Sequence, residues 1–370
     1  MRWTGLLLLV GLVLVPARPA AAHGAGGIEA TNYEGSVGAL SPGLDGVRLK
    51  VAAPGDRLEL RNDGPEVVVL GDAGEPYLRV GPDGAFENRA SPAATRNRAG
   101  QHEPAGSAGA VGAGSAPPEW RRVADGPVVR WHDHRLHRLG ADPPEVAAEP
   151  GLRQVVDPAP AAGGAPGAAS RVTLQRGPTT STADVRLTWV PGPSPAPWFG
   201  LVAVSFLGVA ALGLLRRWRA PIAVAIAVLL AVDLIHAVAA AFATAGGLTS
   251  HLAGVVTGDF YAVAGWVLAV AALRLLIRGR VDGLYAAVFA GLSIGLFGGV
   301  LDLSVLSRST TLFTLPIEVA RLCIALAAGG GAGLVVACTL VIRRTPEARI
   351  VLGDQSDADA ETDAAPQPVG

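Results

Sequence analysis

The stretch Val190–Arg219, VPGPSPAPWFGLVAVSFLGVAALGLLRRWR, divides this 370-residue chain into two regions of different character. Four prolines lie in its first part, residues 191–198, and a segment of this kind favours a stiff, extended linker. An apolar run of membrane-spanning length follows from Phe199 to Leu215, and three arginines then end the stretch. The sequence therefore predicts a separately folded region before the linker and a membrane domain after it.

The composition places the chain in the membrane class. Hydrophobic residues make up 50% of it and the mean hydropathy is +0.39, which together are too apolar for an ordinary soluble domain. The formal net charge is −1, so no excess of basic residues points to nucleic acid as a partner. The partner that this composition predicts is the lipid bilayer.

Five apolar segments of spanning length predict an all-α membrane domain at residues 199–344. Arginines gather after the first, third and fifth segments, whereas the other two loops contain only Arg308. Because basic loops stay in the cytoplasm, we expect a multi-pass cell-membrane protein with an extracytoplasmic N-terminal domain and a cytoplasmic C-terminus. The acidic, polar tail at residues 345–370 is expected to be disordered. The five segments are 199–215, 221–243, 253–277, 284–306 and 315–342.

Residues 1–22 have the three parts of a secretory signal peptide. Arg2 supplies a positive charge, residues 6–15 form a short apolar run, and residues 20–22 are the small residues that a signal peptidase recognises. Cleavage after this segment would make His23 the first residue of the exported protein.

Residues 23–190 are expected to form an exported, all-β domain. Apolar and charged residues alternate with a period of two at residues 47–51 and 57–61, and turns rich in Gly, Pro and Asp separate such segments. Seven or so short strands of this kind predict a β-sandwich of the immunoglobulin or cupredoxin type. Residues 98–118 and 158–170 are rich in small residues and are expected to be disordered surface loops.

Three of the seven histidines lie in WHDHRLH, residues 131–137. If a strand continues through this segment, His132 and His134 point to the same face, and His137 can fold back from the next turn. With the N-terminal amine of His23, they would supply three or four nitrogen ligands. Copper(II) suits such a set best, and zinc is the competitor. The alternative is an exposed edge strand, flanked by arginines, whose histidines bind nothing.

This order of parts resembles copper-resistance proteins of the CopC–CopD type, which have an N-terminal histidine, a β-sandwich and a helical membrane domain. The resemblance implies copper(II) binding by His23 together with His132, His134 or His137. The mature chain has no methionine, which excludes a methionine-lined copper(I) site, and the bundle is shorter than CopD-like domains. The segment GEPYLRVGPDGAFENRASPA (residues 74–93), together with WHDHRLH, is similar to uncharacterised exported membrane proteins of actinobacteria.

Ionisable residues inside the predicted spans form a second candidate site. Asp233 and His236 lie three residues apart on one face of the second span, and Asp259 and Asp302 lie in the third and fourth. A charge in hydrocarbon costs roughly 2.5–3.5 kcal/mol on insertion scales, so such groups usually face one another or water. We expect an outward-facing polar site in which Asp233 and His236 form a relay for a cation or a proton. The alternative is a purely structural network.

In the fifth span, Glu318 and Arg321 are expected to form a structural ion pair. Cys323 and Cys338 lie about 22 Å apart along the same helix by its rise per residue, so they cannot form a disulfide with each other. We expect both cysteines to be packing residues.

No Walker motif, G-x-S-x-G elbow or H-E-x-x-H motif occurs, so nothing in the sequence supports an enzyme. The leading hypothesis is a multi-pass membrane protein whose exported domain binds copper(II) and passes it to the membrane domain. The alternative is a non-metal module for extracytoplasmic interaction or envelope assembly, anchored by the helices.

Overall fold

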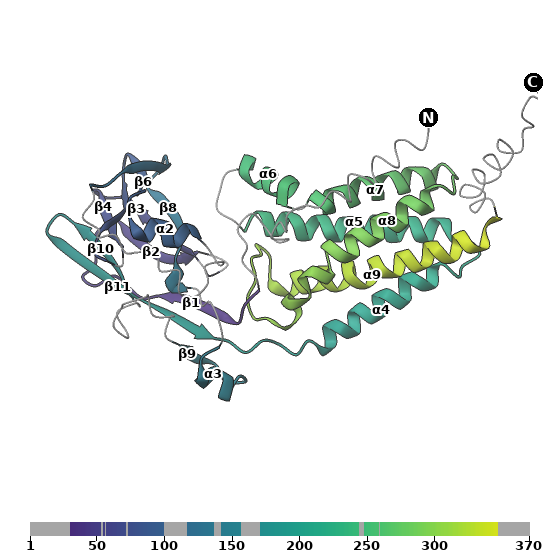
Figure 1. Cartoon of the computed structure of the whole chain (residues 1–370), viewed down its shortest axis with the longest axis horizontal. Coiled ribbons are helices and arrows are strands. Elements are labelled where there is room, and N and C mark those ends of the chain that lie inside the picture. Colours follow the sequence, from purple (N-terminus) through teal and green to yellow (C-terminus); the bar gives the residue numbers. More distant parts are fainter. Residues whose placement is uncertain are drawn as a thin grey trace, which may run out of the picture.

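The structure is a computed structural model, and it describes residues 30–52, 55, 57–71, 73–99, 117–136, 142–156, 171–243, 248–258 and 260–346. Outside these ranges lie the predicted signal peptide, His23, His137, Asp259, most of the two expected loops and nearly all of the tail. Figure 1 shows a β-rich region at one end of the long axis and a helical region at the other.

The described part of the N-terminal region consists mainly of antiparallel strands. The larger sheet has the order β1-β11-β10-β4-β5-β6-β7, with β9 also paired to β11, and the smaller sheet has the order β2-β3-β8. Two short helices, α2 (Pro92–Ala99) and α3 (Pro144–Ala148), pack beside them. The strands are β1 (Tyr33–Val37), β2 (Val47–Ala52), β3 (Arg57–Asn62), β4 (Val67–Leu70), β5 (Pro76–Gly81), β6 (Gly84–Asn88), β7 (Trp120–Ala124), β8 (Val128–His132), β9 (Gln154–Val156), β10 (Arg171–Arg176) and β11 (Thr179–Trp189).

The two sheets share one hydrophobic core. Leu58, Leu60 and Trp131 come from the smaller sheet, Val69 and Leu174 come from the larger one, and all five are buried. The alternate residues of β2 and β3 and the central residue of β8 carry charges and face away from this core. Burial of one large apolar side chain contributes roughly 1.5–3 kcal/mol, so the alternation decides which face of each strand turns inward.

The alternating segments at residues 47–51 and 57–61 coincide with β2 and β3. Further strands that the sequence predicts at residues 67–70, 77–80, 85–88, 171–175 and 185–189 coincide with β4, β5, β6, β10 and the end of β11. Sequence reasoning missed β1, β7 and β9, which are short, carry few large apolar side chains and are held by pairing with β11 or β6. The extended segment expected through Leu136 is wrong: β8 ends at His132, and a 3-10 helix, η2 (His134–Leu136), follows Asp133.

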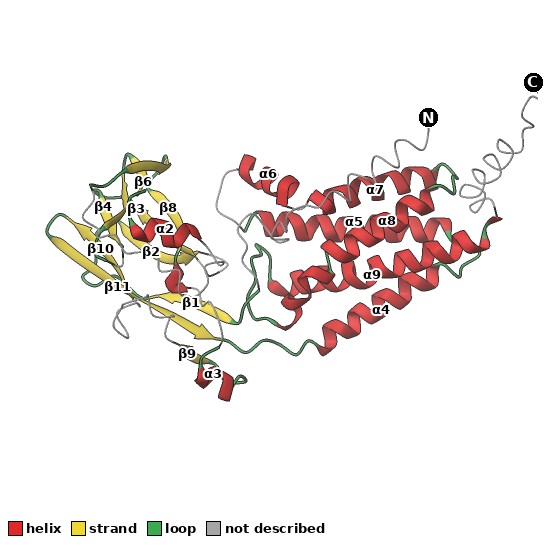
Figure 2. Ribbon diagram, in the orientation of Figure 1, coloured by secondary structure: helices red, strands yellow, loops and turns green. Residues whose placement is uncertain are grey.

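Among the described residues, four helical segments are long and apolar enough to cross a membrane (Figure 2). They are α5 (Arg219–Ala241), α7 (Phe260–Ile277), α8 (Gly283–Phe297) with its 3-10 extension η4 (Val300–Ser307), and α9 (Ile317–Arg344). α4 (Ala196–Leu212) is apolar but has 17 residues. The predicted third span, residues 253–277, covers the second half of α6 (Leu248–Gly258) and all of α7, and Asp259 between them lies outside the described residues. These helices indicate a membrane protein, and the count of five spans stays a prediction.

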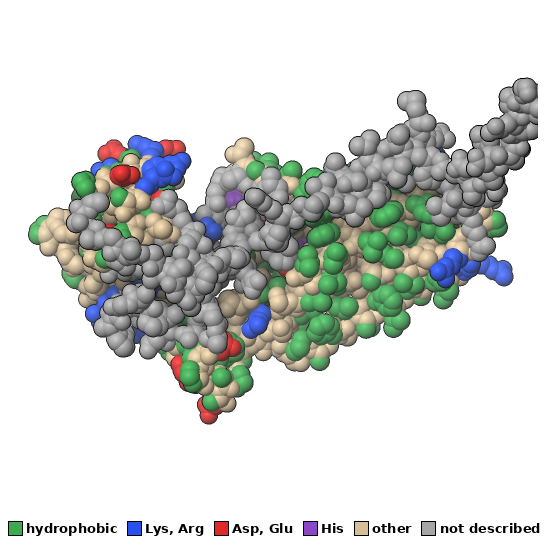
Figure 3. Space-filling model, viewed as in Figure 1, with side chains coloured by type: hydrophobic (Ala, Val, Ile, Leu, Met, Phe, Trp, Pro, Cys, Tyr) green, Lys and Arg blue, Asp and Glu red, His purple; other side chains and the backbone are tan. Residues whose placement is uncertain are grey.

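Glycines bring α9 close to its neighbours. A Cβ on Gly329 would lie 2.2 Å from the Val202 carbonyl oxygen of α4, and a Cβ on Gly331 would lie 2.6 Å from the Gly291 carbonyl oxygen of α8. Both distances are far inside van der Waals contact, so the helices approach one another only because these residues have no side chain. In the sequence, the run of three glycines at residues 329–331 is itself typical of close helix contacts in a membrane, and the structure places it at such contacts. Figure 3 shows hydrophobic side chains over the visible face of the helices.

Two glycines also mark the point where α8 gives way to η4. A Cβ on Gly298 would lie 1.8 Å from Asp233 Oδ1 of α5, and a Cβ on Gly299 would lie 2.4 Å from the Ala328 backbone nitrogen of α9. The chain therefore passes between α5 and α9 at this point with no room for a side chain. This passage places Asp302, on η4, next to α5.

The β region is fastened to the loop between η4 and α9. Thr31 and Thr310 form an antiparallel bridge in which the Thr310 N–H donates to the Thr31 carbonyl oxygen at 2.9 Å. The buried Asn32 accepts the Ser309 N–H at Oδ1, also at 2.9 Å. Residues of β2, β3 and β8 line one cavity together with the end of α5, so the smaller sheet lies over that end of the bundle.

Candidate functional site

The two described histidines of the WHDHRLH segment lie in different local structures. His132 is the last residue of β8 and pairs in register with Arg57 of β3, whereas His134 begins η2. The prediction that both imidazoles project from one face of a strand is therefore wrong. The cause lies in the residue between them, Asp133, which is 0% exposed and turns the chain inward.

Asp133 forms a buried ion pair with Arg135. Its Oδ1 accepts the Arg135 Nε–H at 2.7 Å, its Oδ2 lies 2.6 Å from Arg135 Nη2, and the Trp131 indole N–H donates to Oδ2 at 2.9 Å. Burial alone would raise the pKa of Asp133, but the charge and hydrogen bonds of Arg135, helped by Trp131, hold that pKa well below its usual range. A buried charge needs such partners, so these three residues have a structural role.

The two imidazoles on either side of Asp133 are partly buried. Asn97 Oδ1 of α2 accepts the His134 backbone N–H at 3.3 Å and lies 3.1 Å from His134 Nδ1. Because an amide oxygen only accepts, this contact places the proton of the neutral ring on Nδ1. Burial, together with the charge of Arg57, lowers the pKa of His132. His132 is therefore neutral at pH 7, which is the form of imidazole that binds a metal.

Within the described ranges of the chain, no group of three or more His, Cys, Asp or Glu side chains could hold a metal ion. The other two predicted ligands, His23 and His137, lie outside these ranges. The structure thus describes two of the four proposed ligands, and the copper(II) site as a whole stays a prediction.

In the helical region, two of the predicted ionisable residues, His236 and Asp302, contact each other, and a third, Asp233, has a different partner. The sequence does not reveal this pairing. His236 Nε2 of α5 lies 3.1 Å from Asp302 Oδ2 of η4, and the two side chains are 14% and 13% exposed. Asp233, one turn earlier on α5, is buried and accepts the Trp266 indole N–H of α7 at 2.6 Å. Asp233 and His236 therefore reach partners on two different elements, which joins α5, α7 and η4 through polar contacts in an apolar bundle.

An aromatic ring packs on His236 of this pair, and a basic side chain holds the end of η4. The Phe313 ring lies 5.5 Å from the His236 ring at an angle of 31°. On the α9 side, Arg321 donates to the carbonyl oxygens of Val305 and Arg308 at 3.3 and 2.7 Å. Arg321 Nη1 also lies 3.5 Å from Glu318 Oε1, but this carboxylate is largely exposed. Arg321 therefore holds the end of η4 chiefly through backbone carbonyls.

Sequence reasoning missed Asn97, Trp266 and Phe313, the partners of the predicted residues. A buried carboxylate in a span signals that some donor must lie nearby, but it does not say on which helix. His251 precedes the predicted third span, residues 253–277, and lies on α6, where it is 8% exposed and stacks on Phe242 with ring centroids 4.7 Å apart.

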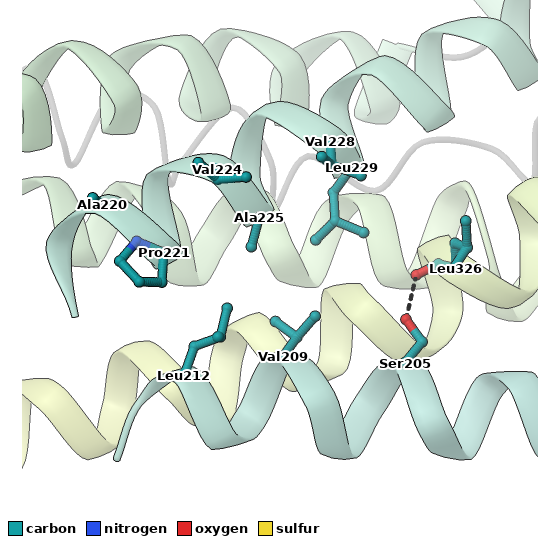
Figure 4. A pocket seen from close by; sticks show the side chains of 10 residues that line it. All are labelled: Ser205, Val209, Leu212, Ala220, Pro221, Val224, Ala225, Val228, Leu229 and Leu326. Carbon is teal, nitrogen blue, oxygen red and sulfur yellow. Dashed lines mark hydrogen bonds between the residues drawn. The ribbon is translucent and has the colours of Figure 1, made fainter. Parts of the chain in front are cut away.

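A groove of about 520 Å³ lies between α4 and α5, over α9 (Figure 4). Its lining is apolar except for Ser205, whose hydroxyl donates to the Leu326 carbonyl oxygen at 3.4 Å. Such a lining suits a hydrocarbon chain and offers no group for chemistry.

The candidate functional residues are thus the partly buried histidines beside Asp133 and the His236–Asp302 pair between α5 and η4. No protein-family model, curated protein or solved structure matches the chain.

Proposed function

We propose that this chain is a multi-pass protein of the cell envelope with an exported β domain and a membrane-embedded, proton-binding pair, His236 and Asp302. Protonation of the pair and docking of the β domain on the helices depend on each other. The proposal includes the topology that the arginine distribution predicts, with the β domain outside and the C-terminus in the cytoplasm. It also treats α4 as a fifth, short span.

One observation carries the proposal: the pair and the docking point of the β domain belong to one short segment. Asp302 lies on η4, and only six residues separate it from Ser309, whose N–H is bound by Asn32. Arg321 holds the carbonyl oxygens of Val305 and Arg308 between these two points. A shift of η4 toward or away from α5 would therefore move the loop on which the β domain rests.

The chemistry of the pair suits a proton. Imidazole is the side chain that gains or loses a proton between pH 5 and 8. When His236 is protonated and Asp302 is ionised, their contact becomes a charge-assisted hydrogen bond, which is roughly twice as strong as a neutral one. Among the described residues, two other charged groups lie on elements packed around this site: Asp233 on α5 is held by Trp266, and Arg321 on α9 is held by backbone carbonyls.

The test is amide hydrogen exchange of the loop at residues 308–314, in the full-length protein in lipid nanodiscs. The Ser309 and Thr310 amides should be better protected at pH 5.5 than at pH 8, after correction for the intrinsic exchange rate. His236→Gln should abolish this dependence. His251→Gln, which changes another buried imidazole of the same bundle, should keep it. Exchange that is independent of pH in the wild type, or equally dependent in His236→Gln, would contradict the proposal.

Copper(II) binding by the exported domain is the second candidate. It is supported by the lowered pKa of His132, which keeps one imidazole neutral, and by the closeness of His134, whose charge acts on that pKa. The predicted ligands remain His23, His132, His134 and His137, with zinc as the competing ion.

Calorimetric titration of the full-length protein with copper(II) and zinc(II) tests this candidate. We expect one copper(II) ion to bind and the affinity to be lost when His132 and His134 are both changed to Ala. Unaltered copper binding by the double variant, or none by a wild-type protein shown to begin at His23, would rule this candidate out.

A further inference from the structure

A cavity of about 290 Å³ lies between the smaller sheet and the end of the helical bundle. Lys50, Glu59 and Arg130 line it on the side of the β region, and Phe242 and Phe313 line it on the side of the helices. It therefore combines charged walls with an aromatic floor. A volume of this size holds about ten waters, or a small polar headgroup.

The charged wall is a row across three strands. Lys50 of β2, Glu59 of β3 and Arg130 of β8 are direct partners in the sheet register. Glu59 Oε1 lies 3.0 Å from Lys50 Nζ, and its Oε2 accepts the Arg130 Nε–H. Burial alone would raise the pKa of Glu59, but the hydrogen bonds and charges of Lys50 and Arg130 outweigh it and lower that pKa. The carboxylate is therefore ionised at pH 7 and holds the two basic groups on either side of it.

The charge of this wall decides which ligands fit. Two positive groups and one negative group leave a net charge of +1 at the cavity. The same face also carries Arg48, Arg57 and Arg61 outside the lining. Asp63 pairs with Arg61 and Arg48, so these four groups together leave a positive net charge beside the cavity. The Lys50 and Arg130 side chains remain 66% and 50% exposed despite their contacts with Glu59, so both can still reach a ligand.

The aromatic floor belongs to the membrane end of the bundle. Phe242 caps the C-terminal end of α5, and Phe313 lies in the loop before α9. The Thr314 N–H and hydroxyl both reach the Ala239 carbonyl oxygen, at 3.2 and 3.1 Å, and so fasten this loop to α5. A ligand in the cavity would thus have apolar surface beneath it and positive charge above it, as at the boundary between lipid tails and headgroups.

We propose that this cavity binds the phosphodiester headgroup of an anionic membrane lipid, with Arg130 and Lys50 on the phosphate and Phe242 and Phe313 against the adjoining glycerol and tails. A phosphodiester carries one negative charge, which the net charge of +1 matches. Arginine suits it because the guanidinium group can donate two parallel hydrogen bonds to phosphate oxygens. The ligand would also lie against Phe313, whose ring packs 5.5 Å from the ring of His236.

The chain offers a direct reporter for this site, because Lys50 is its only lysine. The full-length protein in neutral detergent is treated with an amine-reactive ester, and acylation of Lys50 is followed by peptide mass spectrometry, which separates it from the N-terminal amine. The rate is compared in micelles containing phosphatidylglycerol, in micelles containing phosphatidylcholine, and with inorganic phosphate. At a phosphatidylglycerol concentration about ten times its dissociation constant, the rate should fall about tenfold, because only about one site in eleven is free.

Two variants on the same sheet face provide the matched pair. Arg130→Ala removes a lining group and should abolish the protection by phosphatidylglycerol, whereas Arg61→Ala removes an arginine outside the lining and should keep it. Equal rates in all three conditions would overturn the proposal. Equal protection by phosphatidylcholine would overturn the preference for anionic lipid, and equal protection by inorganic phosphate would show a site for free phosphate instead. The wild-type comparison decides between these outcomes even if Arg130→Ala does not fold.

Discussion

At the scale of single residues, Asp133 decides how the histidine segment is built. Its carboxylate is enclosed by the Trp131 indole and the Arg135 guanidinium, and the side chains of the ion pair are 0% and 5% exposed. Exposed pairs in the same region, such as Arg153 with Glu34 at 62% and 51%, remain in contact with water. Water screens the charges of the exposed pair, whereas a charge left alone in the interior has no such screening. Removal of one partner therefore costs far more at the buried pair, although both contacts are short.

The change Asp133→Ala should destabilise the β region by roughly 3–5 kcal/mol, because it leaves the Arg135 charge buried without its partner. Glu34→Ala, the exposed control, should cost about 0–1 kcal/mol. Urea unfolding of the full-length protein, followed by tryptophan fluorescence, measures both. A cost for Asp133→Ala no larger than that of the control would show that the buried network contributes nothing.

At the scale of elements, the passage from α8 to η4 depends on space as well as on hydrophobicity. An apolar run predicts one continuous helix through residues 284–306, and the α-helix nevertheless ends at Phe297. The reason is the close approach of Asp233 and Ala328 to the two glycines that follow. The change from α-helix to 3-10 helix then brings Asp302 to His236, so the polar pair depends on the glycines.

Gly298→Ala should destabilise the bundle by roughly 1–3 kcal/mol, because its Cβ would displace the Asp233 carboxylate and weaken the bond from Trp266. Gly208→Ala provides the control: this glycine lies within α4 with open space around it, so alanine should be neutral or stabilise the helix by up to about 1 kcal/mol. Thermal unfolding in nanodiscs measures both. Equal melting temperatures for the two variants would contradict the steric argument.

At the scale of the whole molecule, the β region is attached to the helices both by the linker and by the hydrogen bonds of Thr31 and Asn32. The proline-rich residues 191–194 connect β11 to α4 without regular structure, while Thr31 and Asn32 bind the loop before α9. The β region is therefore attached to the bundle twice, once by the chain and once by hydrogen bonds between residues 277 positions apart. Two attachments restrict rotation of the β region far more than the linker could by itself.

The predicted orientation can be measured with single cysteines and a membrane-impermeant maleimide on intact spheroplasts. Ser36→Cys, on an exposed position of β1, should react without permeabilisation, whereas Ser356→Cys in the C-terminal tail should react only after it. The native Cys323 and Cys338 are buried and should give little background. Reaction of the tail cysteine in intact spheroplasts would mean that the arginine distribution does not set the orientation.

The sequence by itself determined the features that follow from local pattern. Alternation at residues 47–51 and 57–61 predicted β2 and β3, because a strand buried on one face repeats every two residues. Apolar runs predicted the membrane helices, because lipid requires every backbone group to be satisfied within its own segment. Isolated ionisable residues in those runs marked Asp233, His236 and Asp302 as candidates, because such residues are costly without a function or a partner.

Only the tertiary structure decided which of these residues meet. His236 contacts Asp302, 66 positions away, β1 is held by β11, and the histidine segment turns at Asp133 because its carboxylate needs the Arg135 guanidinium in the interior. The charged row of the smaller sheet lines one cavity with Phe242 and Phe313 of the helical region. Each of these contacts joins elements whose sequence patterns are independent of each other. The energy that selects the partner arises only when the elements pack, so the pattern within one element cannot reveal it.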